Sequence, residues 1–194
     1  MLSFLDTHEK QIFTGNILFV VCCAFYLAWW LLAFKPTGAV TGLKTGWLLI
    51  PAAITGLLGV IWALRGVLAK PSAAQLLPGL AILAGGIALY FLLWAVTVYL
   101  LKRPATTELI LIVGWGMLAV AEIDALFGYG LFSRGRSVGF IVIICAAAAV
   151  SLVCYALYYR LDMRAGYIDG MIPLLLAALT MAGISLFMAV SDRR

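Results

Sequence analysis

The chain has 194 residues, of which 65% are hydrophobic and 11% are charged, and its formal net charge is +5 at pH 7. With so few charged side chains, a fold of this length cannot cover a water-facing surface with polar groups. This excludes a soluble enzyme, a nucleic-acid-binding domain and a disordered chain. We therefore expect an integral membrane protein whose basic residues, placed beside the apolar runs, contact anionic lipid headgroups.

Six apolar runs in the sequence are long enough to cross a bilayer as helices, because about 20 apolar residues span a hydrocarbon core of about 30 Å. In chain order they are predicted at 12–34, 47–69, 77–101, 108–127, 138–159 and 168–190. The connections between them are short and carry Pro, Gly or Arg. The predicted fold class is all-α: one polytopic transmembrane helix bundle over residues 1–194, in which the first run stays as a span and is not a cleaved signal peptide.

An even number of spans places both termini on one side of the membrane, here called side A, opposite to side B. The basic residues assigned to side A are Lys10, Lys70, Arg134, Arg136, Arg193 and Arg194, with Arg65 near the interface. Those assigned to side B are Lys35, Lys44, Lys102, Arg103, Arg160 and Arg164. This near balance barely decides the orientation. We expect cytoplasmic termini in a plasma or bacterial inner membrane, and a dual-orientation protein would show the same balance.

The two halves of the chain resemble each other weakly. An offset of 93 residues gives 13 identities over the 51 positions from Thr14 to Leu64, against about five expected by chance in this composition. Because a unit of three spans has odd parity, a true duplication predicts an inverted 3+3 repeat about an axis in the membrane plane, as in many transporters. Shared apolar composition is the alternative explanation.

Ionisable side chains within the predicted spans are rare, and each costs about 2.5–3.5 kcal/mol on insertion scales. Arg65 in the second span and Glu122 and Asp124 in the fourth lie near the side-A ends. Asn16 in the first span belongs to the same layer. At about 100° per residue, Glu122 and Asp124 point about 200° apart, so they cannot form one paired-carboxylate site. We expect Glu122, the deeper acid, to face the bundle interior and to approach Arg65.

Two roles remain open for this polar layer. In one, Arg65 and one acid form a buried structural ion pair while the other acid reaches water near the helix end. In the other, the layer lines the path of a solute or proton, and the candidate transport or pore residues are Glu122, Arg65, Asp124 and Asn16. On side B, a mostly solvated ring of interfacial charges is expected to include Glu108, Asp162 and Asp169.

Small residues predict where helices approach one another closely. They are Gly56 and Gly59 in the second span, Gly85 and Gly86 in the third, Gly114 and Gly116 in the fourth, and Ala146–Ala149 in the fifth. Packing is the simple interpretation of these residues, although the stretch 114–116 could also admit a ligand or water beside Glu122.

Little in the sequence supports catalysis or a cofactor. His8 is the only histidine, and the four cysteines lie within apolar runs without the spacing of a zinc site. Neither a metal site nor haem is therefore expected. The sequence contains no nucleophile–base pair, no Gly-rich phosphate loop and no carboxylate cluster suited to Mg²⁺, which disfavours an enzyme.

The leading functional hypothesis is a small channel or secondary transporter for a small polar solute or ion. The alternative is a non-catalytic membrane subunit or scaffold whose intramembrane charges pair with a partner's helices. The expected partners are the lipid bilayer, the solute, and further copies or other membrane subunits, with no nucleic acid and no cofactor. Solute flux through the purified protein distinguishes the two hypotheses.

Overall fold

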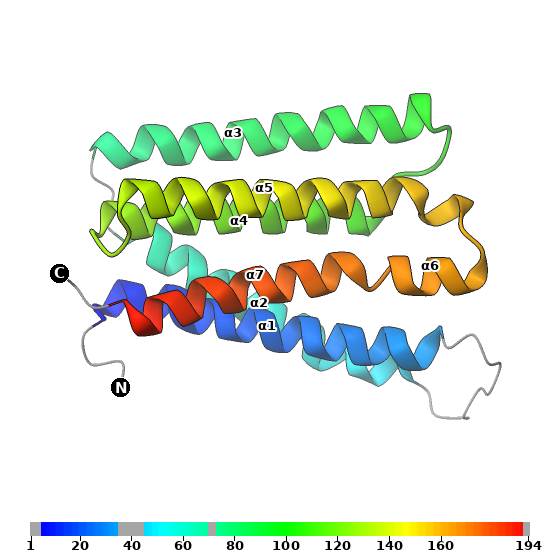
Figure 1. The fold of residues 1–194 in the computed structure, drawn as a ribbon, viewed down its shortest axis with the longest axis horizontal. Helices are drawn as coiled ribbons and strands as arrows, with labels where there is room; N and C mark the ends of the chain where they lie inside the picture. Colours follow the sequence, from blue (N-terminus) through cyan, green and yellow to red (C-terminus); the bar gives the residue numbers. More distant parts are fainter. Residues whose placement is uncertain (1–4, 35–44, 70–72, 192–194) are drawn as a thin grey trace.

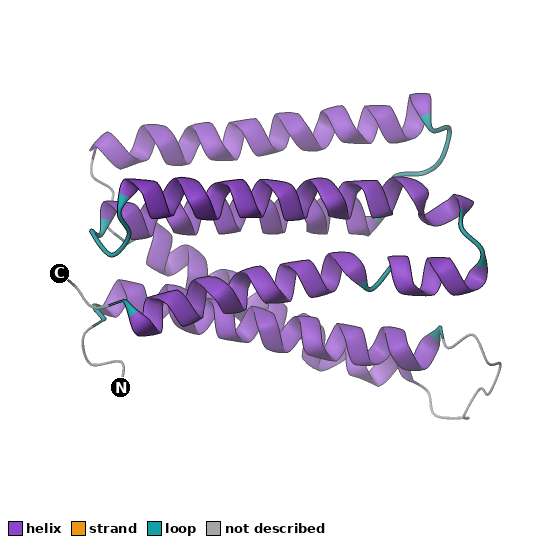
Figure 2. Ribbon diagram, in the orientation of Figure 1, coloured by secondary structure: helices purple, strands orange, loops and turns teal. Residues whose placement is uncertain are grey.

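The computed structural model describes residues 5–34, 45–69 and 73–191. Within these ranges all the regular structure is helical (Figure 2). The elements in chain order are α1 (Thr7–Ala33), η1 (Thr45–Leu48), α2 (Leu49–Leu68), α3 (Ala73–Ala95), η2 (Val96–Leu100), α4 (Thr107–Gly128), α5 (Arg134–Leu157), η3 (Tyr158–Arg160), α6 (Met163–Asp169) and α7 (Ile172–Val190). Of the short elements, η1 and η3 are 3₁₀ turns and η2 is a π-helical turn that extends α3.

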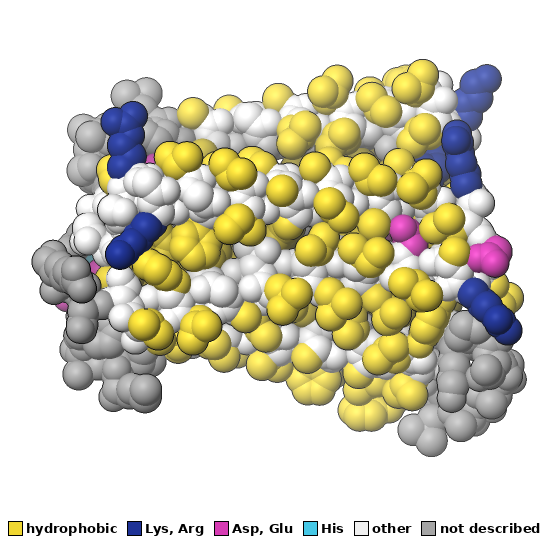
Figure 3. All heavy atoms as spheres, in the orientation of Figure 1, with side chains coloured by type: hydrophobic (Ala, Val, Ile, Leu, Met, Phe, Trp, Pro, Cys, Tyr) yellow, Lys and Arg dark blue, Asp and Glu magenta, His cyan; other side chains and the backbone are white. Residues whose placement is uncertain are grey.

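Six helical segments are long and apolar enough to cross a membrane, which confirms the predicted number of spans. Their bounds are Thr7–Ala33, Thr45–Leu68, Ala81–Leu100, Glu108–Gly128, Arg134–Arg160 and Met163–Val190. Figure 3 shows basic side chains at both ends of the displayed face and a broad band of apolar side chains between them. This distribution is that of a multi-pass membrane protein, with its charges at the two interfaces.

The first helix begins five residues earlier than predicted, because polar residues cap it. The backbone N–H of Asp6 donates to Glu9 Oε2 at 2.8 Å, and the two side chains form a reciprocal capping box. Such a cap satisfies amide groups that would otherwise lack partners at the helix start. The segment 7–10 is therefore the first turn of α1.

The sixth span is not the single helix predicted at 168–190. It is divided into α6 and α7 by a break at Gly170 and Met171, and Pro173 lies in the first turn of α7. A proline has no N–H to donate, and its ring clashes with the carbonyl four residues earlier, so an unbroken helix cannot run through Asp169 and Pro173. The break places Asp169 at a helix end in the side-B half of the bundle.

The helices run side by side along the longest axis of the molecule, with α3 at one edge (Figure 1). The most extensive contacts join α1 to α2 and α7, and α4 to α3 and α5. Two groups of three helices result, α1–α2–α7 and α3–α4–α5, and contacts of α5 with α7 and of α2 with α4 connect them. The start of α1 and the end of α7 lie at the same end of the bundle, as the even span number requires (Figure 1).

Helices α1 and α2 approach so closely that glycine is required at their contact. A Cβ atom on Gly15 would lie 2.7 Å from the Ala63 backbone nitrogen, and one on Gly59 would lie 3.0 Å from the Gly15 carbonyl oxygen. The predicted close approach at Gly56 and Gly59 is confirmed, whereas Gly15 was not singled out from the sequence.

Of the other glycines predicted at close helix contacts, Gly86 is confirmed and two are not. Gly86 of α3 packs directly against the Met117 side chain of α4, as a close helix contact requires. The prediction is wrong for Gly85 and Gly114, because nothing lies within 4 Å of a Cβ atom placed on either residue. Both therefore lie on open faces of their helices.

Candidate functional site

A cavity of about 1040 Å³ lies between the two groups of helices. Its walls come mainly from α1, α2, α4, α5 and α7. Along α4 the lining extends from Thr106, just before the first residue of that helix, to Tyr129, just after the last. Since α4 is one of the membrane-spanning segments, the cavity follows nearly the whole depth of the bundle.

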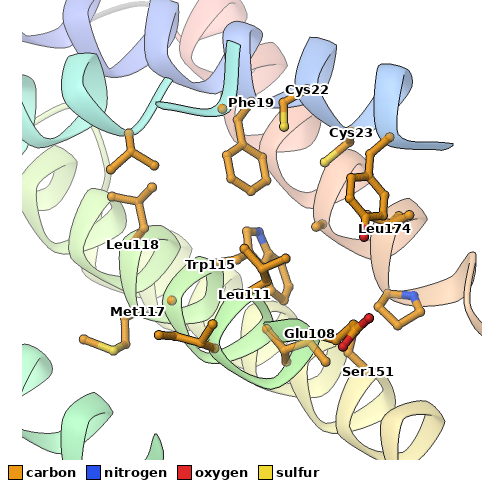
Figure 4. A pocket seen from close by; sticks show the side chains of 18 of the residues that line it. Phe19, Cys22, Cys23, Glu108, Leu111, Trp115, Met117, Leu118, Ser151 and Leu174 are labelled. Atoms are coloured by element: carbon orange, nitrogen blue, oxygen red, sulfur yellow. The ribbon is translucent and has the colours of Figure 1, made fainter. Parts of the chain in front are cut away.

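Most of the cavity wall is apolar. Figure 4 shows Phe19, Cys22 and Cys23 of α1 across the cavity from Leu118 and Trp115 of α4. Among the described residues, every charged side chain that lines the cavity is a carboxylate; these are Glu108, Asp124 and Asp169. No described lysine or arginine lines it. The electrostatic potential of the lining therefore favours a positively charged occupant.

The two acids near the side-A end of α4 have different surroundings, as their angular separation predicts. Asp124 is half-buried and lines the cavity. Glu122 is completely buried, on the same face of α4 as Trp115, Ala119 and Leu126. Its inward orientation is as predicted, but the acid on the cavity wall is Asp124.

Glu122 faces Asn16 of α1, and both side chains are 0% exposed. The Asn16 amide interacts with the carboxyl group, but the two do not reach hydrogen-bonding geometry. Both oxygens of Glu122, together with Oδ1 and Nδ2 of Asn16, are buried without a hydrogen-bond partner. Buried polar groups in imperfect hydrogen-bonding geometry are costly, at about 1–3 kcal/mol for each group that stays unsatisfied.

The predicted contact between Arg65 and Glu122 is wrong. Arg65 is exposed on α2, and neither oxygen of Glu122 accepts a hydrogen bond. The two residues do lie near the same end of their helices, as the parity argument predicted, but depth alone does not fix the direction in which a side chain points. On α2 the buried positions nearest to Arg65 are Ala63 and Gly66, which face α1.

The side-B end of the cavity brings together residues from four elements. They are Tyr26 of α1, Glu108 of α4, Tyr158 of η3 and Asp169 at the end of α6. Glu108 is close enough to both tyrosines to act on them electrostatically, and Asp169 acts on Tyr158 as well. Tyr158 therefore lies within the field of two carboxylates.

Asp169 is buried rather than solvated, which corrects the predicted interfacial ring. The break between α6 and α7 holds it in place, because the Trp30 ring packs on Gly170 and Trp30 Nε1 donates to the Tyr167 carbonyl at 3.0 Å. Asp162 differs from it: it is exposed, and its side chain caps α6 by accepting from the Ala165 N–H at 2.8 Å. Pro173, four residues after Asp169, is the sequence feature that could have distinguished the two acids.

Trp115 also lines the cavity, and it belongs to the stretch 114–116 that the sequence indicated as able to admit a ligand or water. Its side chain is 95% buried, since 5% remains exposed, and it projects from α4 into the cavity (Figure 4). The indole Nε1 has no hydrogen-bond partner. The donor itself is buried in the packing of α4 and is not accessible from the cavity.

Arg103 lies behind the side-B wall. Its guanidinium carbon is 4.6 Å from the centre of the Tyr155 ring and 4.7 Å from that of Tyr159, and Nη2 donates to the Tyr155 carbonyl at 2.6 Å. Both rings line the cavity, but Arg103 does not. The aromatic wall at this end therefore already holds one cation by cation–π contact.

In the part of the chain that the structure describes, no three His, Cys, Asp or Glu side chains are grouped closely enough to hold a metal ion. Cys22, Cys23 and Cys154 line the cavity as free thiols. Comparisons with protein-family models, curated proteins and solved structures find no match for this chain. The function must accordingly be argued from the cavity itself.

Proposed function

We propose that this protein is a small secondary transporter or channel, and that its solute is a cation. The observation that carries the proposal is the cavity, which runs from Thr106 to Tyr129 along a membrane-spanning helix and whose described charged lining is entirely acidic. Asp124 near side A and the pair Glu108 and Asp169 near side B provide attraction at both ends. Such placement lowers the cost of bringing a cation into the low-dielectric interior.

Glu122 and Asn16 are the proposed coupling site. A fully buried carboxyl group with no cationic partner can exchange a proton, and a change in its charge would alter the contact between α1 and α4. In this proposal Asp124 binds the solute, whereas Glu122 takes up and releases the coupling proton. This division follows from their opposite faces of α4 and from the absence of Glu122 from the cavity wall.

The arrangement of helices is compatible with an inverted repeat, which we include in the proposal. Exchanging α1 with α4, α2 with α5 and α3 with α7 converts the contact of α1 with α2 into that of α4 with α5, and the contact of α1 with α7 into that of α4 with α3. Both members of each pair are extensive. The contact of α5 with α7 has no equally extensive counterpart, which allows the two halves to adopt different conformations, as alternating access requires. A second conformation with the cavity open at the other end would test this part.

The test of transport is uptake by purified protein in liposomes, with the orientation of the termini in the vesicles determined in parallel. Asp124→Asn should reduce cation uptake about tenfold or more, because a charge-assisted contact is worth about 1.5–3 kcal/mol. Asp162→Asn is the matched control: it also removes one carboxylate, lies outside the cavity, and retains an N-cap residue. Equal uptake by the two variants, or faster uptake of anions than of cations, would overturn the proposal.

One observation favours the alternative of a membrane subunit. Arg65 is exposed within a membrane-spanning helix and forms no ion pair with any described residue. A partner's acidic side chain could meet it there, whereas the buried Glu122 is out of reach of a partner. Copurification of other chains with the wild type but not with Arg65→Gln, together with no flux by the protein alone, would support the subunit.

A further inference from the structure

We infer that the side-B half of the cavity binds a bulky organic cation, a quaternary or protonated nitrogen or a phosphonium centre carried on an apolar body. This inference rests on the proposed transport function and names the chemical class of its solute. It is carried by the juxtaposition of two carboxylates and a wall of aromatic rings in one apolar cavity.

The charge of the ligand follows from Glu108 and Asp169. They approach the cavity from α4 and α6, and both line it together with Tyr158. The charged groups nearest in the chain, Arg103 and Asp162, do not line the cavity. A cation entering here would therefore meet two carboxylates on the cavity wall, with the Arg103 guanidinium outside the cavity against the Tyr155 and Tyr159 rings.

The aromatic wall indicates a diffuse cation. The Tyr26 and Trp29 ring centres are 5.2 Å apart, those of Trp30 and Tyr158 are 6.1 Å apart, and those of Tyr158 and Tyr159 are 5.4 Å apart. All five residues line the cavity. Aromatic faces attract cations with weakly held hydration, and quaternary ammonium groups are recognised by such cages.

An inorganic cation does not fit this lining. Mg²⁺ or Ca²⁺ would need about six oxygen ligands at short range, whereas the wall is predominantly apolar and no described cluster of three ligating side chains exists. An organic cation needs no such shell. Its apolar body would be buried against side chains such as Phe19, Leu111 and Leu174 (Figure 4).

The size of the cavity is compatible with a drug-sized ligand. Its volume of about 1040 Å³ lies at the upper limit of the about 300–1,000 Å³ of pockets for such ligands.

Binding of tetraphenylphosphonium and tetraphenylborate to the purified full-length protein in nanodiscs tests the inference, because these ions have the same shape and opposite charge. Titration calorimetry against empty nanodiscs should give an affinity for the cation about tenfold or more above that for the anion. Glu108→Gln combined with Asp169→Asn should weaken cation binding about tenfold or more, while Asp162→Asn changes it less than about twofold.

Equal affinities for the two ions, or undiminished cation binding by the double variant, would overturn the inference. If that variant fails to fold, Glu108→Gln alone decides the question, because Glu108 is exposed and its substitution leaves no buried gap. Failure of the two proposals can be told apart. Binding of the phosphonium without any cation flux contradicts only transport, whereas flux of a small inorganic cation such as K⁺ without phosphonium binding contradicts only the inferred ligand class.

Discussion

At the scale of single residues, Glu122 is the most unusual side chain in the bundle. Its carboxyl group is fully buried within a membrane-spanning helix, and its oxygens accept no hydrogen bond. Removing one partner of a buried ion pair typically costs about 3–5 kcal/mol. Because Glu122 has no such partner among the described residues, its substitution should not carry that cost.

We therefore expect Glu122→Gln to melt at the wild-type temperature or above it, since the amide has nearly the same shape and can bear no negative charge. Arg65→Met should leave this result unchanged, and the two effects should add within about 0.5 kcal/mol. Thermal unfolding of the four proteins of this cycle in detergent is the measurement. If Glu122→Gln destabilises the protein and Arg65→Met reverses that effect, the result would support the structural ion pair predicted from the sequence.

The same substitution separates stability from coupling. In liposomes, Glu122→Gln should retain cation binding, because it does not line the cavity, while uptake loses its response to an imposed pH gradient. A variant that responds to the gradient like the wild type would remove Glu122 from the proposed mechanism and leave Asp124 as its only acid near side A.

At the scale of elements, α1 and α2 form the most extensive helix contact. This contact requires glycine, which has no side chain, at the points where the two backbones meet. Gly15 and Gly59 bring the two backbones together, and a Cβ atom on Gly15 would lie 2.7 Å from one backbone atom of α2 and 2.8 Å from another. Backbone atoms cannot turn aside as a flexible side chain can. In lipid, where apolar burial contributes little between helices, such close packing is a main source of association.

Gly15→Ala should therefore destabilise the protein by about 1–3 kcal/mol, the usual cost of overpacking. Gly114→Ala is the matched control in α4, because nothing lies within 4 Å of its added Cβ atom, and alanine is the better helix former by about 1 kcal/mol. The expected order of melting temperatures is Gly15→Ala below wild type and Gly114→Ala at or above it. The reverse order would contradict the packing of α1 on α2.

At the scale of the whole molecule, the parity of the spans can be tested without reference to any function. In a background lacking the four native cysteines, Thr7→Cys and Ser133→Cys should be labelled by a membrane-impermeant maleimide from one side, and Met163→Cys from the other. All three residues are exposed and flank spans. Labelling of positions 7 and 133 from opposite sides is incompatible with six spans, and two labelling populations would indicate dual orientation.

The sequence by itself determined the number of spans, their approximate bounds, and the inward direction of Glu122. These properties are local: the hydrophobic length of a run and the 100° step between residues depend only on residues close together in the chain. The glycines at 56 and 59 were also identified in this way. The errors at this level, the early start of α1 and the break before α7, lie where a cap or a proline acts on a few residues.

Only the tertiary structure decided which polar groups meet. Arg65 and Glu122 share a depth but not a direction, because the rotation of α2 about its own axis is set by the glycine contact with α1. Glu108, Asp169 and Trp115 share a cavity although their positions in the sequence suggested an interface and a packing face. A cavity forms where the side chains of several helices leave space between them unfilled. Its position therefore depends on the side-chain volumes of all its walls together.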